Sequence, residues 1–144
     1  MIIVVFIFTS CHTKNEQKHF LFDDTELMND SLTVKSYNEY ESKNTFFTIT
    51  DSLVIKEIFQ AISKHSKNDY IEFIPTNYSD SFFDFKVTQN KRKFLISTGK
   101  IKEPKKPARG YVDVLRKENR GYIPEGSFYC DTLFEIMKKY NKRR

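Results

Sequence analysis

The sequence is short of the residues that build many recognisable sites. With only four Gly and four Pro in 144 residues, it does not have the composition of a low-complexity disordered chain. Its three histidines stand at no zinc spacing from Cys, Asp or Glu, which leaves a metal site unsupported. It contains no Gly-rich phosphate loop and no G-x-S-x-G elbow. We therefore expect no metal and no cofactor, and we assign no catalytic residue.

Aromatic residues supply much of the apolar content. Hydrophobic residues make up 39% of the chain, with 14 Phe and 8 Tyr but no Trp. A chain of 144 residues is long enough for one domain with a single core.

Charge is distributed unevenly along the chain. Residues 1–90 carry 8 Lys/Arg against 13 Asp/Glu, a net −5, whereas residues 91–144 carry 16 against 6, a net +10; the sum is the overall +5. Such asymmetry suits an anionic partner for the second half, and it also fits a solvated basic edge on a dipolar protein.

The chain begins with an uncharged apolar run, MIIVVFIF, followed by Phe8-Thr9-Ser10-Cys11. A bilayer span needs ~20 residues, so this run is too short to cross a membrane. The run is similar to the apolar region of a secretory signal. The four residues that end at Cys11 resemble the lipobox of bacterial lipoproteins, and the composition is similar to that of lipoproteins from A+T-rich Bacteroidota.

The lipoprotein resemblance implies cleavage before Cys11 and acylation of that residue. Several acyl chains would give a stable membrane anchor. The domain organisation that follows is a signal peptide at 1–10, a lipidated N-terminus and flexible tether at 11–30, and one domain at 31–144. The implied location is the cell envelope, with the outer membrane favoured over the inner. The alternative is an N-terminal core strand that ends in a buried cysteine.

The second cysteine, Cys130, has no partner if Cys11 is acylated, so we expect no disulfide framework. It precedes Leu133 by three residues and Met137 by seven, which is the spacing of one helix face. We expect a buried, inert thiol, because a catalytic cysteine needs a positioned base.

The strongest local pattern is DSLVIKEIFQAISKHS at 51–66. Ile55, Ile58, Phe59 and Ile62 form an apolar stripe at helical period, and Asp51 is placed to cap the helix. A second helix is predicted over about 127–140, with a stripe of Leu133, Ile136, Met137 and Tyr140. Ser127 or Asp131 would cap it.

Short runs of alternating or β-branched and aromatic residues predict strands around these helices. The predicted strands are Ser31–Tyr40, Thr45–Thr50, Tyr70–Ile74, Ser81–Thr88, Arg92–Thr98, Tyr111–Arg116 and Gly121–Ile123. Short polar connectors at 89–91 and 117–120 predict two hairpins. We expect an α+β fold: an antiparallel sheet of about four to six strands with both helices packed on one face.

One segment stands out as a candidate binding site. Ser97–Gly110, STGKIKEPKKPARG, lies between two predicted strands and contains two prolines. Its cations are Lys100, Lys102, Lys105, Lys106 and Arg109. Such a loop could contact an anionic headgroup, an acidic glycan or an acidic protein. The alternative is an ordinary solvated hairpin loop.

Three hypotheses about function remain. The first is a membrane-anchored, non-catalytic interaction module of the envelope: an assembly factor, an inhibitor or an immunity-type protein. The second is an envelope hydrolase whose site gathers scattered carboxylates, such as Asp23 with Asp24, Glu39 with Glu41, or Asp80 with Asp84. The third is an intracellular basic protein that binds nucleic acid. The export signal implied by the lipoprotein resemblance disfavours this third hypothesis. The first is favoured, and the oligomeric state is left open.

Overall fold

The structure is a computed structural model that describes residues 29–38, 43–65, 71, 78–89, 91–102 and 105–142. These residues form an α+β fold, a six-stranded antiparallel sheet with two helices packed against it, as predicted. The elements are β1 (Leu32–Asn38), β2 (Lys43–Ile49), α1 (Ser52–Ser63), β3 (Tyr78–Gln89), β4 (Arg92–Ile101), β5 (Arg109–Glu118), β6 (Gly121–Tyr129) and α2 (Asp131–Asn141).

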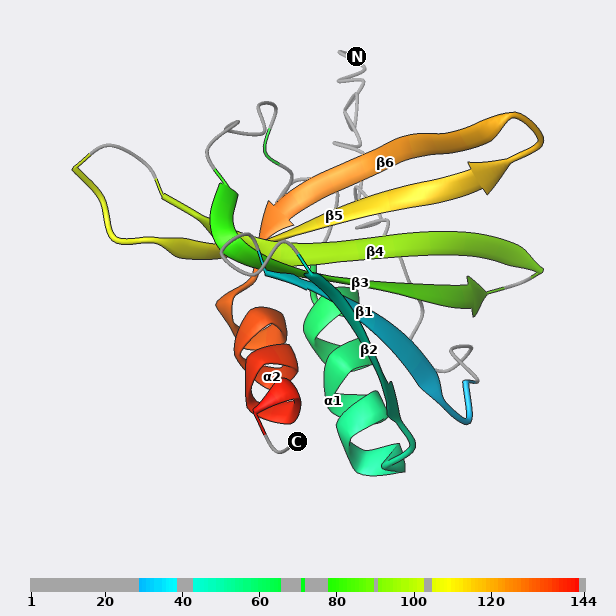
Figure 1. The fold of residues 1–144 in the computed structure, drawn as a ribbon. Helices are drawn as coiled ribbons and strands as arrows, with labels where there is room; N and C mark the ends of the chain where they lie inside the picture. Colours follow the sequence, from blue (N-terminus) through cyan, green and yellow to red (C-terminus); the bar gives the residue numbers. More distant parts are fainter. Residues whose placement is uncertain are drawn as a thin grey trace, which may run out of the picture.

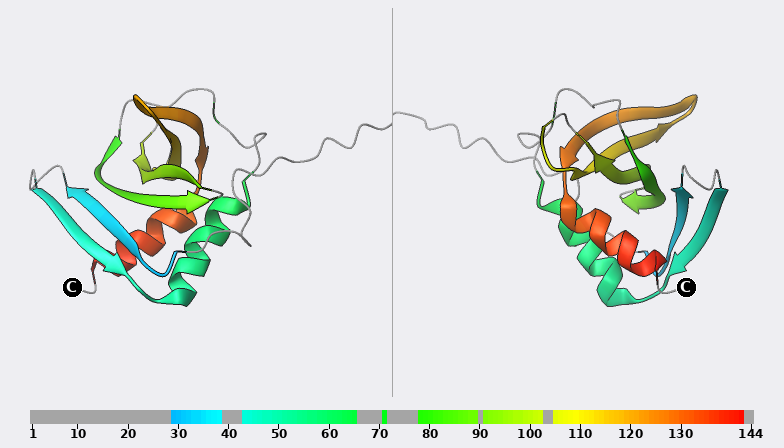
Figure 2. Two further views of the ribbon diagram at one scale, coloured as in Figure 1. Left: turned by 90° about the vertical axis from the view of Figure 1, so that its right-hand side faces the viewer. Right: turned by 60° about the vertical axis from the view of Figure 1, so that its left-hand side comes forward.

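The strand order is β2-β1-β3-β4-β5-β6, with every neighbouring pair antiparallel. β3 to β6 are neighbours in chain order and form a meander. β2 and β3 are not neighbours: the chain leaves β2 through α1, and β3 then pairs with the side of β1 that faces away from β2 (Figure 1). Figure 2 shows that the sheet is strongly bent and that α1 and α2 lie together on one side of it.

The core lies between the sheet and the helices. A single cross-strand row runs through five neighbouring strands on this face, and every member is at most 2% exposed. The row consists of Phe47, Val34, Phe85, Ile96 and Val114. Because successive strand residues point to opposite faces, this row fixes which residues of each strand face the helices.

Helix α1 forms where its apolar spacing predicts it. The carboxylate of Asp51 accepts hydrogen bonds from the backbone N–H groups of Leu53 at 2.9 Å and Val54 at 3.4 Å, which confirms the predicted cap. All four residues of the predicted stripe are buried against the sheet. The helix ends at Ser63, three residues before the predicted boundary.

The predicted start of the second helix is wrong. Residues 127–129 belong to β6, and α2 begins at Asp131, after Cys130 in the cap position. Because Cys130 occupies the cap position, neither of the predicted caps, Ser127 or Asp131, is the capping residue. The Cys130 side chain makes no capping hydrogen bond. Leu133 and Met137 are buried as predicted, while Ile136 and Tyr140 are partly buried against the core. Phe134 is buried as well, which widens the apolar stripe.

β6 is longer than predicted because it tolerates residues that usually end a strand. Pro124 lies in an edge strand, where a missing N–H disrupts no ladder. The register shifts between Val114 paired with Gly126 and Leu115 paired with Pro124, which leaves Glu125 as a bulge.

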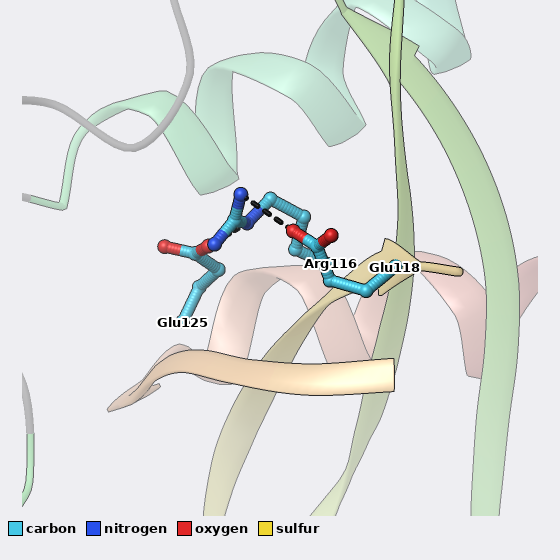
Figure 3. A network of polar contacts seen from close by, with 3 residues as sticks. All are labelled: Arg116, Glu118 and Glu125. Atoms are coloured by element: carbon cyan, nitrogen blue, oxygen red, sulfur yellow. Dashed lines mark hydrogen bonds and ion pairs between the residues drawn. The ribbon is translucent and has the colours of Figure 1, made fainter. Parts of the chain in front are cut away.

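Figure 3 shows Arg116 between the two carboxylates of Glu118 and Glu125. Arg116 Nη1 lies 2.7 Å from Glu118 Oε1, and Nε bonds Glu125.

Both predicted hairpins are present. Gln89 pairs with Arg92 and Glu118 pairs with Gly121, so each turn has two central residues. The remaining predictions fall largely outside the described residues: the signal at 1–10, the tether up to residue 28, and the strand Tyr70–Ile74 except Ile71. Ile71 is not in a strand, and its N–H donates to the carbonyl oxygen of Ser127 at 2.8 Å.

Candidate functional site

The predicted basic segment forms the end of the β4–β5 hairpin. Its first and last residues are in strands rather than in a loop, because Lys100 pairs with Gly110 and Ile101 pairs with Arg109. The connection itself is therefore limited to residues 102–108. In Figure 1 this connection extends away from the helices, at the left of the molecule.

Lys100 is held against α2. Its Nζ lies 3.0 Å from Glu135 Oε1 and 5.1 Å from the centre of the Phe134 ring. Since its charge already faces a carboxylate and an aromatic ring, Lys100 is a weaker candidate for binding an external anion than the lysines of the connection.

Arg109 has a different environment on the opposite face of the sheet. Its guanidinium carbon lies 4.1 Å from the centre of the Tyr129 ring, although the residue as a whole is exposed. A planar guanidinium stacked on a ring keeps its N–H groups at the ring's periphery, where they can still bind an anion.

Gly110 joins the hairpin to α2. Its N–H donates to Asp131 Oδ1 at 2.5 Å, and its carbonyl oxygen accepts from the Cys130 N–H at 2.9 Å. A Cβ at this position would lie 2.6 Å from the Cys130 carbonyl oxygen and 2.7 Å from Asp131 Cα. Only glycine therefore allows the backbones to approach this closely.

The other three predicted cations lie in the connection itself. Lys102, Lys105 and Lys106 are all exposed, and Lys105 has a φ of 63°. A positive φ in a residue that is not glycine marks a tight turn of the backbone. Of the five predicted cations, the structure thus places two at the anchored ends and three in the connection.

Each carboxylate pair proposed for a hydrolase has at least one side chain outside the described residues. Asp23, Asp24, Glu39 and Glu41 lie outside the described residues, and so does the side chain of Asp80. The structure instead places Asp84 and Asp113 in one cross-strand row on the sheet face opposite the helices. One strand separates them, so their backbones are about 9.5 Å apart.

Serines on neighbouring strands bind both of these carboxylates. Ser97 Oγ donates to Asp84 Oδ1 at 2.6 Å, and Ser127 Oγ donates to Asp113 Oδ1 at 2.5 Å. Burial raises the pKa of Asp113, and the Ser127 hydrogen bond partly offsets that rise. The alternating Asp and Ser side chains satisfy each other across the strands, which accounts for them without catalysis.

This Asp–Ser row was not predicted from the sequence, although part of its pattern is visible there. Asp84 and Ser97 are symmetric about the two-residue turn at 90–91, so a hairpin of that length pairs them. Asp113 and Ser127 are not symmetric about the turn at 119–120, because the Glu125 bulge adds one residue. The second pair therefore required knowledge of the bulge.

A shallow cavity of about 260 Å³ lies between the helices, separate from the carboxylate row. Its lining includes Lys64, His65 and Cys130. Cys130 is buried, as predicted, and its Sγ lies 3.8 Å from the Ala61 carbonyl oxygen. Burial is the main cause that raises the pKa of the thiol. A thiol kept protonated is a poor nucleophile, so this cavity lacks an activated cysteine.

Among the described residues, no three His, Cys, Asp or Glu side chains are grouped so as to hold a metal ion. Within the same part of the chain, no helix combines the length and apolar character that a membrane crossing requires. No protein-family model, curated protein or solved structure matches this chain.

Proposed function

We propose that this protein is a membrane-anchored, non-catalytic interaction module of the cell envelope, with its β4–β5 connection directed at an anionic partner. One observation carries the proposal: Lys102, Lys105 and Lys106 are exposed on a projecting connection whose two ends are fixed. The pairing of Ile101 with Arg109 joins the two ends, and the Gly110–Asp131 hydrogen bond attaches the second end to α2.

Because both ends of the connection are fixed, we favour a binding role for it over the alternative of an ordinary solvated hairpin loop. Presenting three cations from a connection with anchored ends reduces the entropy that is lost when a partner binds. Clustered charge of one sign also speeds the encounter with an oppositely charged surface. The non-catalytic part of the proposal is supported by Asp84 and Asp113, which serines already bind, and by the protonated Cys130 thiol.

The anchor is supported by the lipobox resemblance at Phe8-Thr9-Ser10-Cys11, which lies outside the described residues. Acyl chains on Cys11 would hold the domain at a membrane surface. The test is metabolic labelling with a palmitate analogue in the native host, followed by membrane fractionation. Cys11→Ser should lose the label and either leave the membrane fraction or keep its signal; Cys130→Ser should change neither. Unlabelled, cytosolic wild-type protein would overturn the anchor.

The β4–β5 connection is tested by a triple change of Lys102, Lys105 and Lys106 to Gln. The matched control changes three exposed lysines elsewhere, Lys56, Lys93 and Lys139, so the loss of net charge is the same. Binding is measured by sedimentation with phosphatidylglycerol vesicles and, separately, by titration with polyglutamate. The connection variant should bind at least one probe more weakly than the control, most clearly at low salt. Equal loss in both variants would reject a local site.

A further inference from the structure

The two edges of the described sheet differ in how they are protected. On the β6 edge, Pro124 lacks an N–H, Glu125 forms a bulge, and Ile71 donates a hydrogen bond to Ser127. These are devices that prevent another strand from pairing with an edge. β6 is therefore a poor template for a further strand.

The β2 edge has none of these devices along its described length. Lys43–Ile49 pairs with β1 in unbroken register through all seven residues and contains no Gly or Pro. Within the described part of the sheet, β1 is its only neighbouring strand, and Figure 2 shows β2 at the margin of the sheet. Six of its seven residues are uncharged, and Phe46 is 62% exposed. A regular edge with an exposed aromatic side chain is a template for strand addition.

We propose that β2 pairs antiparallel with β2 of a second copy of this chain, which joins two sheets around a two-fold axis at Phe46. An antiparallel pair is the arrangement that a two-fold axis perpendicular to the sheet produces. With Phe46 on the axis, its ring meets the same ring of the second copy. On that face Asn44 then lies opposite Thr48; on the other face Thr45 lies opposite Phe47.

The sequence of β2 is complementary to itself in this register. Polar Asn44 meets polar Thr48, and the most exposed aromatic side chain of the described residues covers its own copy. The single charged residue, Lys43, lies opposite Ile49 and meets no like charge. Aromatic cross-strand pairs such as Phe–Phe are favourable, while facing like charges would destabilise the pair. A single strand pair is a small interface, so the dimer should dissociate in the micromolar range.

The first experiment compares two matched substitutions by sedimentation equilibrium of the full chain in density-matched detergent. Phe46→Lys places like charges together on the axis and should raise the dimer Kd by about 100-fold or more. Ile123→Lys is the control, since Ile123 is an exposed apolar residue on the opposite edge strand. It should leave the dimer Kd unchanged. Circular dichroism checks that both variants fold.

The second experiment tests the register by cysteine cross-linking of the full chain with Cys11→Ser and Cys130→Ser. With copper phenanthroline as the oxidant, Phe46→Cys should form a disulfide-linked dimer, because directly opposed Cβ atoms lie about 5 Å apart and a small backbone shift brings them within disulfide range. Thr48→Cys should not, because the two copies of residue 48 would be displaced by four residues, about 13 Å. A wild-type chain that stays monomeric at high micromolar concentration, or equal cross-linking of both variants, would overturn the proposal.

Discussion

The backbone N–H of Gly110 donates a 2.5 Å hydrogen bond to Oδ1 of Asp131, which attaches the start of β5 to the first turn of α2. The same carboxylate lies at the positive end of the α2 dipole. One side chain thus stabilises both the helix terminus and the position of the basic connection. Because the backbone of Gly110 lies so close to the backbone of Cys130 and Asp131, a side-chain atom added at residue 110 would disturb this contact.

We predict that Gly110→Ala destabilises the protein by about 3 kcal/mol, the upper part of the range for overpacking. All three atoms that the new Cβ would meet belong to the backbone of Cys130 and Asp131, so none can rotate away. Gly99→Ala is the comparison, because its Cβ would meet side chains, with Tyr111 Cε1 at 2.9 Å. Urea unfolding should show the larger loss for Gly110→Ala; the reverse order would contradict the role of this contact.

We predict that Ile58→Ala and Phe59→Ala each cost about 2–5 kcal/mol of unfolding free energy, the range for large-to-small changes in a core. Ile58 is 0% and Phe59 4% exposed, and both contact the core between α1 and the sheet. Leu53→Ala on the same helix should stay within about 0.5 kcal/mol, since Leu53 is exposed. A large effect at Leu53 would mean that the exposed face of α1 is covered.

The apolar periodicity of α1 was predictable from sequence because one stripe and one capping residue agree. The strands of the two hairpins were predictable for a similar reason: alternation sets the face and the short connector sets the register. The extent of β6 was not predictable, since Pro124 and Gly126 normally end a strand and only an edge position with a bulge admits them. The roles of Lys100 and Arg109 also depended on tertiary neighbours, Glu135 and Tyr129, that local sequence does not indicate.

We predict a pH-dependent stability term from Asp113. Burial raises its pKa from the ordinary value of 3.8, so the folded state holds the proton more tightly than the unfolded state. The stability from this group is fully present below pH 3.8 and is lost as pH rises through the folded pKa. Asp113→Asn keeps an acceptor for Ser127 and removes the charge. Relative to wild type, it should gain stability between acidic and neutral pH in urea titrations; a constant difference would contradict the assignment.

The last prediction concerns the reactivity of Cys130. Burial raises the pKa of its thiol from 9.0, which lowers the thiolate fraction at a given pH. Because the thiol is also buried near the Ala61 carbonyl, iodoacetamide should label it much more slowly than an unfolded cysteine at the same pH. The measurement is made on the full chain with Cys11→Ser, so that Cys130 is the only thiol. Labelling should accelerate along the urea unfolding curve, because exposure and pKa then change together. Fast labelling of the folded chain near neutral pH would instead indicate an activated nucleophile beside His65 and Lys64 in the cavity between the two helices, and it would contradict the prediction of an inert thiol.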